Sequence, residues 1–200
     1  HHYEASKQKC KIAVNATTGD LDSIGKLHRL RAKSKTMGFS NEYITFCIIQ
    51  IHYLQNQYWK VIRKINSFLL TLEEGYENLK IVCLFMRGYC HRRIRNTKAA
   101  FNDYHAVVKH DPHFYPALGN IATIYFAIGN MNRAYEYWTR ALDHQVSMKE
   151  NVHYLTNRAK ALVRLKRYEE ALADCDQASN LEPENEEIAL IREEIVESQQ

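Results

Sequence analysis

The sequence predicts an all-α fold, an α-solenoid in which antiparallel helix pairs stack side by side. Only seven glycines and three prolines occur in 200 residues, whereas a β-sandwich or barrel needs frequent turn signals. The stretch RYEEALADCDQASNLEPEN carries alanines seven residues apart, Ala171 and Ala178, and its helical pattern stops at Pro183. Because small residues on an apolar side let helices approach closely, we expect each helix to press against a neighbour.

The same arrangement returns at near-constant intervals along the chain. Ala134 is also followed seven residues later by a small residue, Ala141. It lies 34 residues after Ala100 and 37 residues before Ala171. The longer interval fits a 34-residue period with three extra residues in the polar stretch His144–Glu150. We therefore expect repeated units rather than one irregular bundle.

This pattern resembles the tetratricopeptide repeat, a helix–turn–helix unit of about 34 residues. The resemblance covers three units, 81–114, 115–148 and 152–185. In the last unit the family's small and aromatic positions hold Ala159, Leu162, Tyr168, Ala171, Cys175, Ala178 and Pro183. The resemblance implies a right-handed superhelix whose inner groove is lined by the first helix of each unit.

Residues 4–71 are interpreted as two degenerate repeats. The first, 4–33, reads as two helices around a turn. In the second, Trp59 takes the place of the aromatic residue that packs at the turn, and Ile62 and Leu69 replace the small anchors. The helices of this unit are therefore expected to pack farther apart.

A capping helix is predicted for residues 186–197. It places Ile188, Ile191 and Ile195 on one face and glutamates elsewhere, so one side can cover the last repeat while the other stays polar. The whole chain, 1–200, is expected to form a single helical-repeat domain.

Composition limits the compartment and the kinds of partner. Residues 169–200 hold eleven acidic residues and one basic residue, whereas residues 1–168 hold 26 basic and 12 acidic residues. A basic body can steer an acidic partner toward itself, although a solvated surface explains the same charges. Five cysteines without a C-x-x-C pair favour free thiols in a reducing, cytoplasmic setting. No apolar run approaches the roughly 18 residues of a membrane span.

No catalytic or cofactor-binding motif stands out. The sequence has no glycine-rich phosphate loop, no H-E-x-x-H and no G-x-S-x-G. We therefore expect no enzyme activity, no cofactor and no metal. Cys83, Cys90 and His91 come closest to a metal-binding set, but the two cysteines lie seven apart on one helical face. They are expected to pack as small hydrophobic residues, as is Cys175.

The resemblance also implies a set of partner-binding positions on the first helices. They mix apolar side chains and amides, which suit an extended peptide or a helix, with cations that favour carboxylates or phosphates. A solvated face is the alternative reading. The positions are Phe85, Met86, Tyr89, Arg92, Arg93, Asn120, Thr123, Phe126, Asn157, Lys160 and Arg164.

These observations favour a non-enzymatic protein-interaction module that acts as an adaptor or assembly scaffold. Family members that hold the acidic tails of heat-shock chaperones use a five-residue carboxylate clamp. Starting from the unit at 81 only Asn120 matches it, and starting one unit later only Asn157 does, so that clamp is not expected. RNA binding by the basic body is an alternative, disfavoured because the basic residues do not recur once per repeat. The interaction domain of a longer enzyme is another.

Overall fold

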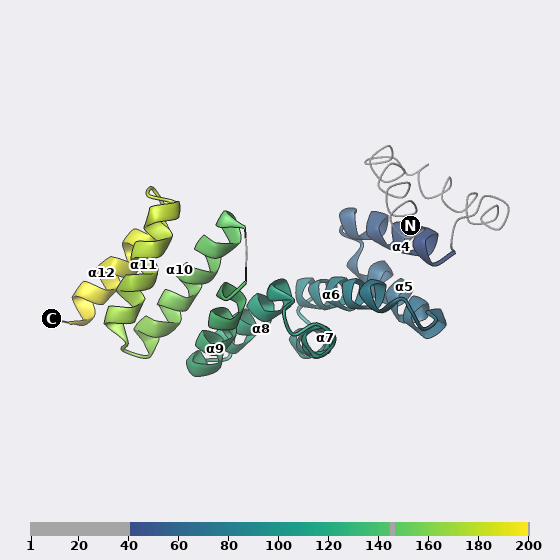
Figure 1. Cartoon of the computed structure of the whole chain (residues 1–200), viewed down its shortest axis with the longest axis horizontal. Coiled ribbons are helices and arrows are strands. Elements are labelled where there is room, and N and C mark those ends of the chain that lie inside the picture. The colour runs from purple at the N-terminus through teal and green to yellow at the C-terminus, as the bar shows by residue number, and fades with distance from the viewer. Residues whose placement is uncertain (1–40, 145–146, 200) are drawn as a thin grey trace. The chain divides into compact units, whose positions relative to one another are not determined.

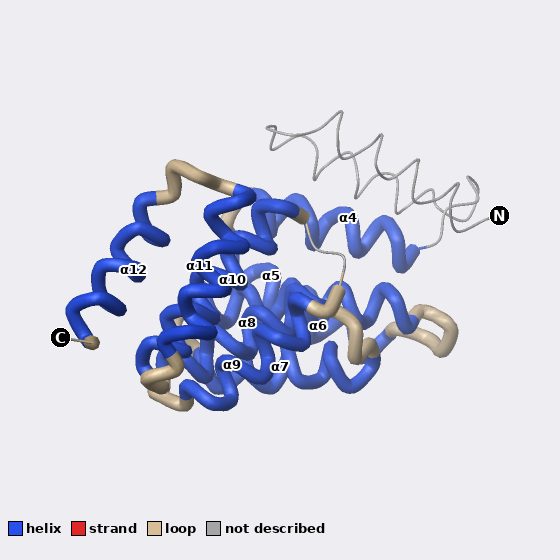
Figure 2. The backbone as a smooth tube through the Cα atoms, turned by 60° about the vertical axis from the view of Figure 1, so that its left-hand side comes forward, coloured by secondary structure: helices blue, strands red, loops and turns tan. Residues whose placement is uncertain are grey.

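The computed structural model describes residues 41–144 and 147–199. Within these ranges the regular structure is helical and no strand occurs, which confirms the all-α prediction (Figures 1 and 2). The predicted unit at 4–33 lies outside the described residues. The helices are α4 (Asn41–Leu54), α5 (Tyr58–Thr71), α6 (Glu77–Arg93), α7 (Thr97–His110), α8 (Tyr115–Ala127), α9 (Met131–Leu142), α10 (Met148–Arg164), α11 (Tyr168–Leu181) and α12 (Glu186–Ser198).

The chain divides into two compact units, 1–100 and 101–200. In the described part of the first unit, α5 packs against both α4 and α6. Their shared core centres on Ile49, Val61 and Ile65, none of which has exposed surface. Burial of a large aliphatic side chain stabilises the fold by about 1.5–3 kcal/mol, so these contacts hold the three helices together.

The second unit is a solenoid, because its helices pack in chain order. α8 contacts α9, α9 contacts α10, and α10 contacts α11. The last helix, α12, lies against both α10 and α11 and buries Ile188, Ile191 and Ile195. One face of α12 therefore closes the core of the last helix pair, as its isoleucine spacing predicts.

Each helix pair turns through the same backbone motif. The second residue after the end of the first helix adopts a left-handed conformation, with φ between 56° and 83°, at Asn56, Arg95, Gly129 and Lys166. In the last pair the Lys166 N–H donates to the Val163 carbonyl, and the next N–H donates to the Leu162 carbonyl, both at 2.9 Å. These two hydrogen bonds satisfy carbonyl groups at the helix end that have no partner within the helix. The second helix of each pair begins two residues after the left-handed residue.

That motif corrects the sequence register of the α4–α5 pair by one residue. Because Asn56 is the left-handed residue, α5 begins at Tyr58, and the Tyr58 ring packs on the core. Trp59 is 70% exposed, so the prediction that it packs at the turn is wrong. Val61 and Phe68, which lie one residue before the expected anchors, are buried; of the expected anchors, Ile62 is also buried and Leu69 is half-buried.

The predicted small anchors of the second unit are fully enclosed. Ala134, Ala141 and Ala171 have no exposed surface, and Ala178 has none either. Trp138 is 1% exposed and packs with Ala134, Ala141 and side chains of α8 and α10. The close helix approach that the alanines predict is therefore present.

The cysteines of the described residues are buried free thiols. Cys83 and Cys90 have no exposed surface and Cys175 has 1%, which confirms their predicted role in packing. Burial raises the pKa of both Cys83 and Cys90 to about 12, and of Cys175 to about 11. These thiols therefore stay protonated and unreactive in the folded protein.

Candidate partner-binding faces

The predicted positions of the second unit lie on two adjacent helices, α8 and α10. We call the exposed part of this pair that carries Asn120, Thr123, Phe126, Asn157, Lys160 and Arg164 the first-helix face. The helices meet where the Tyr154 ring lies on Gly119: a Cβ on this glycine would sit 2.5 Å from Tyr154 Cε1. No side chain fits between ring and backbone, so the glycine permits this contact. Burial of Tyr154 also raises its pKa.

Gly119→Ala is expected to lower the free energy of unfolding by about 1–2 kcal/mol. Overpacking a core contact costs about 1–3 kcal/mol, and the better helix propensity of alanine returns up to about 1 kcal/mol. Chemical denaturation measures the difference. The double variant Gly119→Ala/Tyr154→Leu, which makes room for the new methyl group, should be more stable than the sum of the two single changes predicts. Strict additivity would show that Gly119 and Tyr154 do not share this contact.

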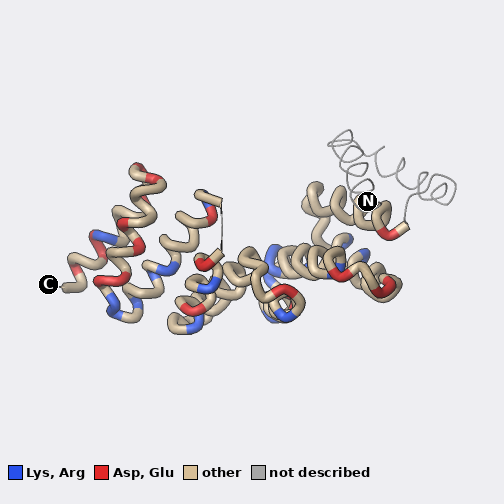
Figure 3. Tube along the Cα trace, in the orientation of Figure 1, with Lys and Arg blue, Asp and Glu red and all other residues tan. Residues whose placement is uncertain are grey.

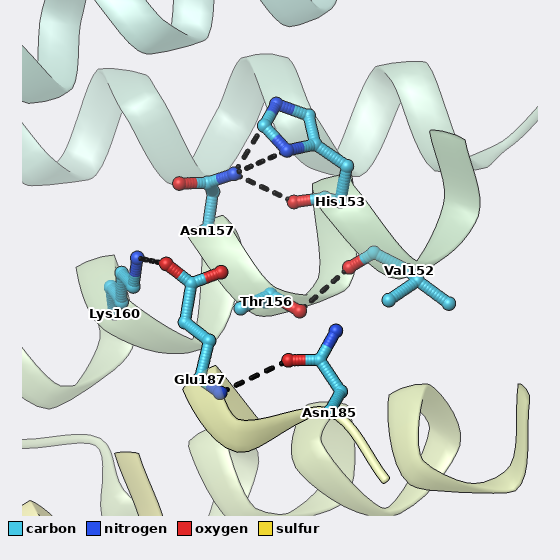
Figure 4. A network of polar contacts seen from close by, with 7 residues as sticks. All are labelled: Val152, His153, Thr156, Asn157, Lys160, Asn185 and Glu187. Atoms are coloured by element: carbon cyan, nitrogen blue, oxygen red, sulfur yellow. Dashed lines mark hydrogen bonds and ion pairs between the residues drawn. The ribbon is translucent and has the colours of Figure 1, made fainter. Parts of the chain in front are cut away.

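Two amides hold the same position on successive first helices. Asn120 Nδ2 donates to the Pro116 carbonyl at 2.7 Å. Asn157 Nδ2 donates to the His153 carbonyl, also at 2.7 Å (Figure 4). Asn157 Nδ2 also lies 3.2 Å from His153 Nδ1. These contacts occupy the amide nitrogens, and within the described structure neither amide oxygen accepts a hydrogen bond. Each helix therefore presents one oriented acceptor.

Two further residues of the face, Thr123 and Phe126, follow Asn120 on α8 and differ in polarity. Thr123 Oγ1 donates to the Gly119 carbonyl at 2.9 Å, so its oxygen can still accept. Phe126 is half-buried against Trp138, with ring centroids 5.7 Å apart. The face thus combines fixed polar acceptors with an apolar surface.

The cations of the second unit are largely held by its own acidic helices. Lys160 forms an ion pair with Glu187 of α12, so its charge already has a partner (Figure 4). Arg158 and Arg167 pair with carboxylates of α11, where acidic residues gather (Figure 3). Arg164 is exposed and makes no ion pair within the described residues. The acidic segment therefore balances much of the local positive charge.

In the first unit, two of the predicted positions differ in exposure. Met86 is 7% exposed and packs in the core with Ile49 and Val61, so it does not face a partner. Its place on α6 turns it toward α5, which the assumed register did not predict. Phe85 is half-buried.

Tyr89, Arg92 and Arg93 gather with two tyrosines that the sequence did not single out. The Tyr89 ring lies 5.4 Å from Tyr53 and 6.5 Å from Tyr58, between centroids. The Arg92 guanidinium lies 5.6 Å from the Tyr89 centroid, and that of Arg93 lies 5.5 Å from the Tyr58 centroid. We call these five residues the aromatic–arginine cluster. Burial raises the pKa of Tyr53 to about 12, so the ring stays neutral.

Tyr53 and Tyr58 were missed because partner-binding positions were predicted only for the units from residue 81 onward. With the repeat counted from Asn56, Tyr53 takes the same place in its unit as Arg92 in the next, and Tyr58 begins the second helix as Tyr168 does. A left-handed asparagine is the signal that could have placed them.

Two further searches of the described residues give negative results. No group of three or more histidine, cysteine, aspartate or glutamate side chains there could hold a metal ion. No described helix has the length and apolar character needed to cross a membrane.

One helix pair of the second unit matches a known sequence family. The sequence model of the tetratricopeptide repeat matches residues 152–185, the α10–α11 pair. This helix pair is a tetratricopeptide repeat. No curated protein sequence matches it.

Solved structures of tetratricopeptide-repeat proteins share the fold. MamA (residues 41 to the end) from Desulfovibrio magneticus RS-1 is 13% identical, with a TM-score of 0.68 over 91% of this chain and 96% of that one. YrrB, described as a TPR protein with an unusual peptide-binding site, is 13% identical, with a TM-score of 0.63 over 92% and 97%. The TPR domain of Arabidopsis OM64 is 23% identical, with a TM-score of 0.54 over 60% and 96%. These likenesses concern the fold.

Proposed function

We propose that this tetratricopeptide-repeat protein is a non-enzymatic adaptor that binds a segment of a partner protein along the first-helix face. The observation that carries the proposal is the pair of equivalent amides, Asn120 and Asn157, each fixed by a 2.7 Å bond to its own helix. Their free oxygens lie at the same position of successive units. We place the interaction inside the cell, in a reducing compartment, where the buried thiols remain reduced.

The chemistry of the face suits a peptide backbone. A backbone N–H of the partner can donate to each amide oxygen, and an amide held in place loses little conformational entropy on binding. Phe126 and Thr123 lie on the same helix as the first amide and add an apolar and a polar contact. Arg164, exposed at the end of α10, can meet a carboxylate of the segment.

The test compares two pairs of asparagines in the full chain. Wild-type protein recovers partners from extracts of the native cell, mass spectrometry identifies them, and the bound segment is synthesised for titration. Asn120→Ala/Asn157→Ala should lower the affinity for the titrated segment about tenfold, because two hydrogen bonds are lost at about 0.5–1.5 kcal/mol each. Fluorescence anisotropy measures the affinity.

The control is Asn102→Ala/Asn132→Ala, which removes two exposed asparagines from the second helices α7 and α9. It should bind like wild type. Equal affinity in all three proteins, or an equal loss in both variants, would contradict the proposal.

A further inference from the structure

Positive charge is concentrated along α6 of the first unit, and of these side chains Lys80 pairs with Glu77. Residues 78–102 contain six basic side chains and no acidic one. Arg92 and Arg93 are exposed, and within the described structure neither forms an ion pair. This differs from the second unit, where Lys160 and Arg158 are paired with carboxylates.

Tyrosine rings, rather than carboxylates, hold these two guanidiniums. Arg92 lies over Tyr89 and Arg93 lies over Tyr58, at 5.6 and 5.5 Å from the ring centroids. A cation–π contact orients the guanidinium without using up its five N–H donors. Tyr58 is itself fixed, because its hydroxyl donates to Asn56 Oδ1 at 2.7 Å. Two oriented guanidiniums, on the adjacent residues Arg92 and Arg93 at the end of α6, therefore keep N–H donors for a ligand.

We infer that the aromatic–arginine cluster binds an anionic protein segment, through carboxylate or phosphate groups paired with Arg92 and Arg93. Guanidinium donors match the geometry of both anions, and a bidentate pair adds directional specificity. This site lies in the first unit and does not depend on the amide contacts of the first-helix face. It adds the chemical class of the partner segment to the proposed adaptor role.

Single-stranded RNA fits the cluster less well. RNA-binding proteins without sequence preference stack bases on open aromatic faces. Here Tyr89 already contacts Tyr53, Tyr58 and Arg92, so its ring is engaged on several sides. The open groups are the guanidinium donors.

The experiment titrates the full chain with four labelled probes by fluorescence anisotropy. These are a 12-residue peptide of alternating glutamate and glycine, the same peptide with phosphoserine for glutamate, a serine–glycine peptide, and a 12-nucleotide oligouridylate. Both anionic peptides should bind and the neutral one should not. The ratio of the dissociation constants of the glutamate and phosphoserine peptides shows which anion the site prefers.

Arg92→Gln/Arg93→Gln should lower the affinity for the anionic peptides about 100-fold, which is about tenfold for each lost charged contact. Arg95→Gln/Lys98→Gln removes the same charge close by but outside the cluster, and should change affinity less than about threefold, by screening of exposed charges. Tyr89→Leu should weaken binding, whereas Tyr89→Phe, which keeps the ring, should not.

Three results would overturn the inference. The first is that neither anionic peptide binds. The second is that Arg92→Gln/Arg93→Gln and Arg95→Gln/Lys98→Gln lose equal affinity for the anionic peptides. The third is that oligouridylate binds more tightly than the peptides and that its binding depends on Arg92 and Arg93. The last result would assign the cluster to nucleic acid. Normal helical circular dichroism of each variant excludes unfolding as the cause.

Discussion

Trp138→Ala is expected to lower the free energy of unfolding by about 3–5 kcal/mol, the range for removing a large buried aromatic side chain. Trp138 is 1% exposed and packs against Ala122, Ala134 and Tyr154, so it joins three consecutive helices of the second unit. The neighbouring alanines cannot expand to fill the cavity. Urea denaturation followed by circular dichroism measures the loss.

The other tryptophan of the chain is a matched control. Trp59 is 70% exposed, so Trp59→Ala should change stability by less than about 0.5 kcal/mol. Similar losses in the two variants would contradict the assignment of Trp138 to the core and of Trp59 to the surface. The fluorescence of the remaining tryptophan in each variant gives a second check, because a buried indole should emit at shorter wavelength.

Asp174→Ala is expected to lower the free energy of unfolding by about 3 kcal/mol. Asp174 accepts two hydrogen bonds from Arg158, Nε to Oδ2 at 2.8 Å and Nη2 to Oδ1 at 2.6 Å, and its side chain is 4% exposed. Arg158 also donates to Thr139 Oγ1 at 3.1 Å, so it links α10 to both α9 and α11. Removing the carboxylate leaves a largely buried guanidinium without its counter-ion. Thermal and urea denaturation measure the cost.

An exposed ion pair on the same helix supplies the comparison. Asp176 pairs with Arg192, but its side chain is 64% exposed, so Asp176→Ala should cost less than about 1 kcal/mol. The double variant Arg158→Met/Asp174→Leu should recover much of the stability lost in Asp174→Ala, because no charge is left buried. Equal costs for Asp174→Ala and Asp176→Ala would show that burial does not decide the energy of these pairs.

The sequence predicts most of the fold because the repeat signal is local. Alanines at fixed intervals mark the helix contacts of the second unit, and they are buried as expected. The signal fails at α5, where two aromatic residues stand side by side. Which of Tyr58 and Trp59 packs depends on the backbone turn at Asn56, and side-chain size alone selects the wrong one.

The candidate faces were less predictable than the helices. Exposed positions can be placed from the repeat register, but whether a cation is free depends on side chains distant in sequence. Lys160 meets Glu187, 27 residues away, so its charge is already compensated. Arg93 lies over Tyr58, which comes from the preceding helix pair, whereas Arg92 lies over Tyr89 of its own helix. Pairing across helices cannot be read from a 34-residue period.

The most direct test of the account is photo-crosslinking from the first-helix face in cells that produce the protein. A benzoylphenylalanine at Arg164, which is exposed at the end of α10, is compared with one at Asn132, which is exposed on the second helix α9. Mass spectrometry maps the linked residues. We expect that the probe at position 164 crosslinks to one defined segment of a partner protein and that the probe at position 132 does not. Crosslinking of the same partner from Asn132 but not from Arg164 would contradict it.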